Sequence, residues 1–141
     1  MSDFSFKKRE RLTSSKSISL LFKEGRSISS FPVRFIYDME GTDVPVKMAI
    51  SVPKRLYKRA VDRNLLKRRI REAYRLNKTE FYAEIGKMNQ QVNVVIQYQH
   101  RKIVDFHAIE AGILKGMDRV MKELDQQTVN LTNNGAAPKT D

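Results

Sequence analysis

Apolar residues along the chain follow two different periods, and the changes of period delimit the predicted elements. Ile18, Leu21 and Phe22 stand at positions i, i+3 and i+4, which is the spacing of one face of a helix. Ser14 and Ser15 precede them as candidate helix caps, and Gly25 follows as a stop signal. The pattern therefore predicts a short amphipathic helix near the N-terminus.

Strand-like alternation with a period of two comes next, over residues 33–39 and again over residues 46–52. The polar residues 40–43 between them are typical of a turn, so the two stretches are predicted to pair as a hairpin. A third apolar stretch, residues 92–98, is apolar at consecutive positions. That pattern predicts a strand buried on both faces.

Two further segments have a helical period. Residues from about Lys58 to Leu76 contain no Gly or Pro, and a polar stretch around Gly86 follows them. Asp105 is a candidate cap for a last helix. The predicted apolar face of that helix consists of Phe106, Ile109, Ile113, Met117, Val120, Met121 and Leu124.

The order helix–strand–strand–helix–strand–helix predicts an α/β or α+β fold in which a small sheet is covered by helices. Residues 1–13 are interpreted as a basic N-terminal arm, and residues 14–125 as one folded domain. Residues 126–141 lack apolar periodicity, so a disordered tail is expected there.

Charge then narrows the function. The chain has 27 Lys and Arg against 16 Asp and Glu, a formal charge of +11. Such an excess favours a polyanionic partner, because phosphate binding releases counterions. The chain has no cysteine, no signal-peptide pattern and no run of roughly 20 apolar residues that would cross a bilayer. We therefore expect a cytoplasmic protein with no membrane partner.

Positive charge is concentrated on the helix that begins near residue 58. Basic residues recur there every four positions, at Arg59, Arg63, Lys67, Arg71 and Arg75. Surface helices usually alternate signs, because opposite charges at i and i+4 stabilise and like charges destabilise. Arginine can contact phosphate oxygens in a bidentate way, and the neighbouring amide of Asn64 can contact a base edge or a ribose hydroxyl. The pattern favours RNA over lipid, since the apolar residues of this helix suffice only for packing on a sheet.

The run from Lys58 to Glu72 closely resembles the "RNR" signature of the bacterial ribonuclease P protein subunit. Supporting segments stand in the order that the resemblance requires: Arg11-Leu12, Ile18 to Gly25, Val33 to Tyr37, and Met48 to Arg55. The resemblance extends over roughly residues 7–124. It implies three helices around a small four-stranded sheet, with one short strand that the periodicity does not separate, and a left-handed β-α-β crossover.

The resemblance also implies a function. In this family the protein joins ribonuclease P RNA, and the holoenzyme hydrolyses one phosphodiester bond to remove the 5′ leader of precursor tRNA. The RNA carries the active site and, mainly, the Mg²⁺ ions, so no catalytic residue is expected in the protein and DNA is not an expected partner. Whether the protein binds a metal itself is left open.

Site residues follow from the resemblance position by position. The residues expected to bind the catalytic RNA are Lys54, Arg55, Lys58, Arg59, Arg63, Asn64, Lys67, Arg68 and Arg71. The leader cleft is expected to contain Phe22 of the first helix with Arg34, Phe35 and Tyr37 of the first predicted strand. Core packing is the alternative for the three aromatic residues. Family members commonly have an aromatic residue where this chain has Ile18.

Other functions are less well supported by the sequence. A protein nuclease needs metal ligands or an acid–base pair, and His100 and His107 stand in no recognisable constellation. A ribosomal protein or RNA chaperone would need the same basic surface and is the alternative function. A DNA-binding regulator would need a helix-turn-helix or dimer context, and none is evident.

Overall fold

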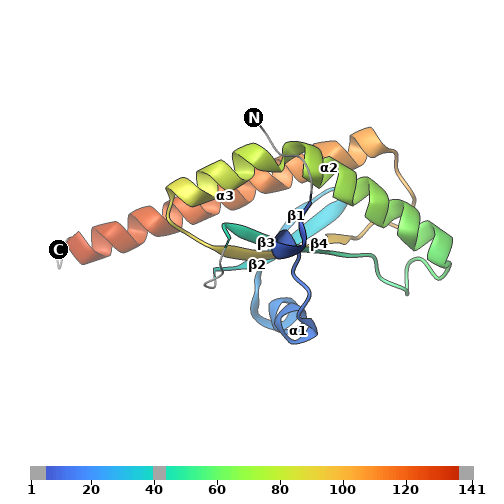
Figure 1. The fold of residues 1–141 in the computed structure, drawn as a ribbon, viewed down its shortest axis with the longest axis horizontal. Coiled ribbons are helices and arrows are strands. Elements are labelled where there is room, and N and C mark those ends of the chain that lie inside the picture. The colour runs from blue at the N-terminus through green and yellow to red at the C-terminus, as the bar shows by residue number, and fades with distance from the viewer. Residues whose placement is uncertain (1–5, 40–43, 137–141) are drawn as a thin grey trace.

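A four-stranded sheet separates two long helices on one face from a short helix on the other (Figure 1). The structure, a computed structural model, describes residues 6–39 and 44–136. Its elements in chain order are the 3-10 helix η1 (Lys8–Glu10), α1 (Ser15–Glu24), β1 (Arg26–Ser30), β2 (Val33–Asp38), β3 (Val46–Ser51), α2 (Ala60–Lys87), β4 (Val92–Tyr98) and α3 (Phe106–Ala136). The expected three helices and four-stranded sheet are confirmed.

The strand order in the sheet is β1-β2-β4-β3. β4 lies between β2 and β3, antiparallel to the first and parallel to the second. The predicted hairpin of residues 33–39 with residues 46–52 is therefore wrong. β4 takes the central position because it is apolar on both sides, with Val94, Val95 and Ile96 all buried.

The true hairpin joins β1 to β2 through the two residues Phe31 and Pro32. β1 is the short strand that periodicity did not separate. Its sequence, RSISS, contains one apolar residue, Ile28, and is too polar to be distinguished from a loop. The strand forms because β2 offers it a complete antiparallel register from Arg26↔Tyr37 to Ser30↔Val33.

α2 connects the parallel strands β3 and β4 and extends to Lys87, well past the expected end at Leu76. The buried stripe of Ile70 and Tyr74 continues through Phe81 and Ile85, which the polar residues between them conceal. The left-handed sense of this crossover stays a prediction.

Both predicted caps are confirmed. Ser14 Oγ accepts a hydrogen bond from Ser17 N at 3.2 Å, and Asp105 Oδ1 accepts one from Ala108 N at 2.9 Å. α3 continues to Ala136, so residues 126–136 are helical and the predicted disordered tail is wrong there. Propagation of an existing helix needs no further apolar stripe. Residues 137–141 lie outside the described residues.

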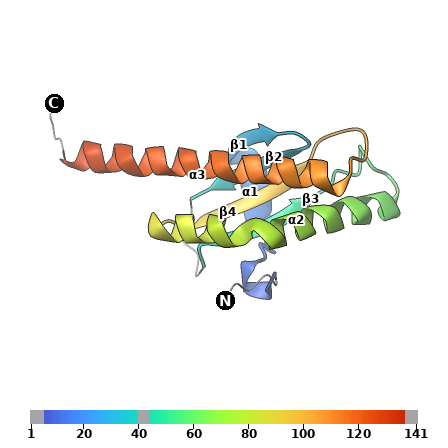
Figure 2. The same ribbon diagram turned by 90° about the horizontal axis from the view of Figure 1, so that it is seen from above.

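Figure 2 shows α2 and α3 side by side over the sheet, with the C-terminal part of α3 projecting beyond it. The main core lies between these helices and the sheet, and a smaller core of Leu12, Leu21, Ile36 and Val95 lies under α1. Within the described ranges, no helix combines the length and apolar character needed to span a membrane.

Candidate nucleic-acid interface

The loop before α2 presents four of the predicted RNA-binding residues to solvent: Lys54, Arg55, Lys58 and Arg59. A turn forms the loop, because Leu56 N and Tyr57 N both donate to the carbonyl of Pro53 at 3.1 Å. Arg59 is the N-terminal flanking residue of α2, and its guanidinium lies 3.7 Å from Asp62 in the first turn. The loop is thus a fixed projection that carries cationic side chains.

Arg63 has a structural contact as well as a charge. Its Nη1 donates to the carbonyl oxygens of Tyr57 and Lys58, both at 2.8 Å. These two bonds tie the cationic loop to the first turns of α2. We therefore interpret Arg63 as a residue that shapes the interface, and its expected contact with RNA stays a prediction.

The basic residues that recur every four positions, which we call the basic ridge, are divided between two sides of α2. Steps of four residues drift around a helix of 3.6 residues per turn, which amounts to roughly 160° between Arg59 and Arg75. Arg75 is accordingly paired with Glu72 at 2.6 Å. Arg69 Nη1, on the same helix, donates to Val104 O at 2.7 Å. The exposed polar and cationic residues on the first part of the helix are Asn64, Arg68 and Arg71.

Lys67 and Arg71 border a groove of about 560 Å³ that we call the N-terminal groove. Residues from the N-terminal segment, α1, β3 and α2 line it: Phe6, Arg11, Leu12, Thr13, Ile18, Met48, Ala49, Ile50, Lys67 and Arg71. The lining combines three cations with an apolar floor and includes no carboxylate. That composition suits an anionic strand whose bases need apolar contact.

A buried ion pair holds the N-terminal wall of this groove. Lys78 Nζ of α2 lies 2.5 Å from Glu10 Oε1, the same oxygen accepts from Tyr82 OH at 2.8 Å, and Lys7 N donates to Oε2 at 3.0 Å. Lys78 is 3% and Glu10 8% exposed. Burial by itself raises the pKa of the Glu10 carboxyl, but the hydrogen bonds from Lys78, Lys7 N–H and Tyr82 outweigh it, so its pKa lies below the ordinary value.

Packing completes the attachment of the N-terminal segment. The Phe6 ring contacts the Tyr74 ring edge-on at 5.7 Å, and Leu12 N donates to Met48 O of β3 at 3.0 Å. Residues 6–13 are therefore part of the folded body and not a separate arm, while residues 1–5 lie outside the described residues. Sequence reasoning missed Glu10 and Lys78, because 68 residues separate them and nothing in either local pattern marks them.

The sheet face that α1 covers is the second candidate surface. Beside the small core, Arg34 Nη2 donates to Gln97 Oε1 at 2.9 Å, and Gln97 Nε2 donates to Ser51 Oγ at 3.4 Å. These polar residues form a row across β2, β4 and β3. Phe22 of α1 is 41% exposed. The structure thus has Arg34 and an exposed Phe22 on the α1 side of the sheet.

Phe35 and Tyr37 lie on the opposite face, and their assignment to one cleft with Phe22 and Arg34 is wrong. Both are 0% exposed in the main core. The Phe35 ring abuts Gly116 of α3, and Tyr37 OH donates to Glu123 of α3. Successive side chains of a strand point to opposite faces, so Arg34 and Phe35 cannot share one. The strand period alone would have selected Ile36 as the neighbour of Arg34.

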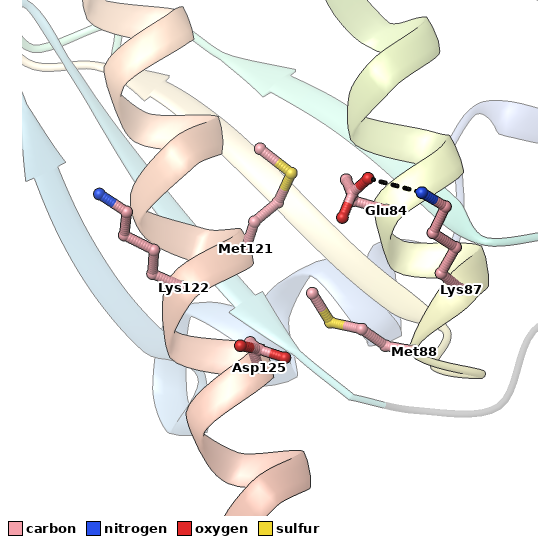
Figure 3. Close-up of a pocket in the computed structure, with 6 residues that line it drawn as sticks. All are labelled: Glu84, Lys87, Met88, Met121, Lys122 and Asp125. Carbon is pink, nitrogen blue, oxygen red and sulfur yellow. Dashed lines mark hydrogen bonds and ion pairs between the residues drawn. The ribbon is translucent and has the colours of Figure 1, made fainter.

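A further depression of about 460 Å³ lies between the C-terminal part of α2 and α3 (Figure 3). The side chains of Met88 and Met121 point into the space between the helices, and Lys87 pairs with Glu84 at 3.3 Å. Two carboxylates, those of Glu84 and Asp125, are among its lining residues. This mixed charge is less suited to RNA than the N-terminal groove.

Among residues 6–39 and 44–126, no three His, Asp or Glu side chains are grouped as metal ligands. Each of the two histidines contacts a different aromatic ring: His100 contacts the ring of Phe31, and His107 contacts the ring of Phe106.

Comparison with known proteins gives a consistent result. The family model described as Ribonuclease P matches residues 6–121. The chain is similar to the ribonuclease P protein component of Porphyromonas gingivalis, with 31% identity over 119 residues, 83% of this chain and 87% of the relative. It is 33% identical to that of Dictyoglomus thermophilum over 112 residues, 79% of this chain and 88% of the relative.

Solved structures agree in fold. The ribonuclease P protein of Staphylococcus aureus matches with a TM-score of 0.64 at 20% identity, over 79% of this chain and 94% of that one. The protein from Thermotoga maritima matches with a TM-score of 0.61 at 27% identity, over 78% of this chain and 96% of that one.

Proposed function

The chain belongs to the ribonuclease P protein family, and from that membership we propose that it binds ribonuclease P RNA and the 5′ leader of precursor tRNA. As a member it is the protein subunit of a ribonucleoprotein endoribonuclease that processes tRNA. The protein assists removal of the leader, and the RNA carries the active site together with most of the Mg²⁺. No reacting group is assigned to the protein.

The observation that carries the proposal is the N-terminal groove beside the first part of α2, which is lined by three cationic residues and by no carboxylate. The catalytic RNA would lie along the loop before α2 and the outer side of that helix. The residues assigned to it are Lys54, Arg55, Lys58, Arg59, Asn64, Lys67, Arg68 and Arg71, with Arg63 fixing their geometry. Neutralising phosphate repulsion between two large RNAs is their proposed contribution.

The leader would bind on the α1 side of the sheet. Phe22 offers an exposed ring on which an unpaired base can stack, and Arg34 offers a cation in the row beside it. Ile18, partly buried at the groove, supplies an aliphatic contact where family members often have an aromatic one. Phe35 and Tyr37 support this face from the core without touching the leader.

A cleavage assay tests the proposal. A 5′-labelled precursor tRNA is incubated at low Mg²⁺ with the protein alone, with a bacterial ribonuclease P RNA alone, and with both. We expect rapid cleavage at the mature 5′ end only in the mixture. If the protein leaves the rate unchanged while it still binds RNA tightly, a ribosomal or RNA-chaperone function replaces this one.

A further inference from the structure

An exposed aromatic pair stands at the end of the sheet beyond the surfaces already assigned. Phe31, in the turn between β1 and β2, is 61% exposed. Its ring meets the ring of His100 edge-on, with centroids 4.8 Å apart and planes at 74°. His100 is the second residue after the end of β4, so two neighbouring strands bring the two rings to one place. Single exposed apolar side chains are common on protein surfaces, so it is the pairing of this ring with His100 that distinguishes the place.

The turn that carries Phe31 is held firmly against α3. Ser30 Oγ donates to Gly112 O at 2.8 Å, and Gln99 N donates to Pro32 O at 3.0 Å. Gly112 lets the backbones approach closely, since a Cβ there would lie 2.3 Å from Phe31 O. The ring is thus presented by a fixed backbone, which reduces the entropy lost when a ligand packs on it.

His100 is fixed in the same way from the other side. Its carbonyl accepts a hydrogen bond from Tyr57 OH at 2.8 Å, and Tyr98 OH donates to Lys102 O two residues further on at 2.5 Å. The bond from Tyr57 joins the loop after β4 to the cationic loop before α2, and the bond from Tyr98 ties the same loop back to β4. The aromatic pair is therefore continuous with the surface that we assign to RNA.

The surroundings of the pair are cationic and polar. Arg101 and Lys102 follow His100 and are exposed, and Arg119 of α3 donates to Ser29 O at 2.6 Å. Gln99 Nε2 donates to Ser29 Oγ at 3.4 Å, which extends the row of Arg34 and Gln97 toward Phe31. A planar aromatic ring amid cations and amide groups suits an unpaired nucleobase with its phosphate.

We propose that Phe31 and His100 form a stacking site for an unpaired base of the precursor leader, beyond the part of the leader that meets Phe22. The inference rests on the proposed function. Phe31 stands three positions before Arg34, so the site lies roughly 10 Å further along the strand direction. A leader that crosses the Arg34 row in that direction reaches the pair only if it is long enough.

The test measures binding of the reconstituted holoenzyme, protein plus a bacterial ribonuclease P RNA, to precursor tRNAs with a short and a long leader. Phe31→Ala is compared with Phe31→Tyr, which keeps a ring, and with Phe22→Ala, which removes the first contact. Phe31→Ala should weaken binding of the long leader roughly five- to hundredfold and leave the short leader unchanged. Phe31→Tyr should bind both as the parent protein does.

Each other outcome is decisive. If Phe22→Ala weakens both leaders and Phe31→Ala weakens neither, the stacking site is overturned and the proposed function stands. Equal losses for both leaders with Phe31→Ala would place its contact on the tRNA body or the catalytic RNA, against our assignment. If neither variant changes the binding of any leader, leader binding by this face fails altogether. Unchanged thermal unfolding of each variant establishes that the comparison concerns binding, as expected for an exposed side chain.

Discussion

Lys78→Met should destabilise the protein more than any other single change of a charged residue in the described part. The substitution keeps a long apolar stem but removes the ammonium that lies 2.5 Å from Glu10 Oε1. Glu10 would then be an almost fully buried carboxylate with hydrogen bonds only from Tyr82 and Lys7 N–H. Removing one partner of a buried pair costs about 3–5 kcal/mol, because the other charge is left uncompensated.

Urea unfolding near neutral pH measures that loss directly as a lower midpoint at an unchanged slope. For a domain of this size, the loss corresponds to a fall in Tm of roughly 10–20 °C. Lys87→Met is the matched control. Lys87 is on the same helix and pairs with Glu84 at 3.3 Å, but its side chain is 75% exposed, so little change is expected from it.

Acid should reduce the difference between parent and Lys78→Met proteins. The folded-state pKa of Glu10 lies below its ordinary value of 4.5 in the parent, so the pair stabilises the fold above that pH. This contribution is lost as pH falls through the lowered pKa. In Lys78→Met, burial would dominate and raise the pKa of Glu10, so protonation relieves the unpaired charge at a higher pH.

A double-mutant cycle with Glu10→Gln isolates the interaction. Glu10→Gln/Lys78→Met should be more stable than Lys78→Met alone, because no buried charge remains. If Lys78→Met costs less than about 1 kcal/mol near neutral pH, the pair behaves as an exposed one and the reasoning fails. Equal losses at neutral and acid pH would refute the electrostatic explanation in a different way, because they would assign the loss to packing.

Three further predictions concern packing and RNA. Gly116→Ala would place a Cβ 2.3 Å from the Phe35 ring and should lower the free energy of unfolding by about 1–3 kcal/mol. Gly86 has open space around it, so Gly86→Ala should stabilise α2 by up to about 1 kcal/mol. Thermal unfolding of both variants checks the two predictions. Phe35→Ala should lower the free energy of unfolding by about 3–5 kcal/mol and, in protein that remains folded, leave the ratio of precursor to mature tRNA binding unchanged, because the ring is buried. Arg71→Ala should weaken binding to the catalytic RNA and reduce the slope of log affinity against log salt by about one. Lys87→Ala is the control. If the slope of Arg71→Ala equals that of the parent protein, Arg71 does not contact a phosphate.

The local sequence pattern was sufficient to predict those features that depend only on residues within one helix or next to it. Ser14 and Asp105 cap their helices as predicted, since a cap depends on a few adjacent residues. The apolar face of α3 buries Ile109, Ile113 and Val120, since its stripe follows the helical period directly. Six of the cationic residues predicted to bind RNA before and within α2 are exposed for the same reason: Lys54, Arg55, Lys58, Arg59, Arg68 and Arg71. The resemblance to the family was carried by that segment.

Pairings between distant residues needed the tertiary structure. β1 is a strand only because β2 lies beside it, and β2 and β3 are separated because β4 is apolar on both faces. The alternation along β2 already assigns Arg34 and Phe35 to opposite faces of the sheet. Only the packing of α3 shows which of the two faces is buried in the main core.

The class of this protein, its positive charge and the location of its basic helix could be predicted from the amino-acid sequence alone. Those properties depend on residue type and on spacing within one helix or strand. The tertiary structure alone decided which residues form surfaces together: Glu10 with Lys78 at the N-terminal groove, and Phe31 with His100 at the end of the sheet. Such contacts join residues 68 or 69 positions apart, and their energy depends on burial and geometry that no local pattern encodes.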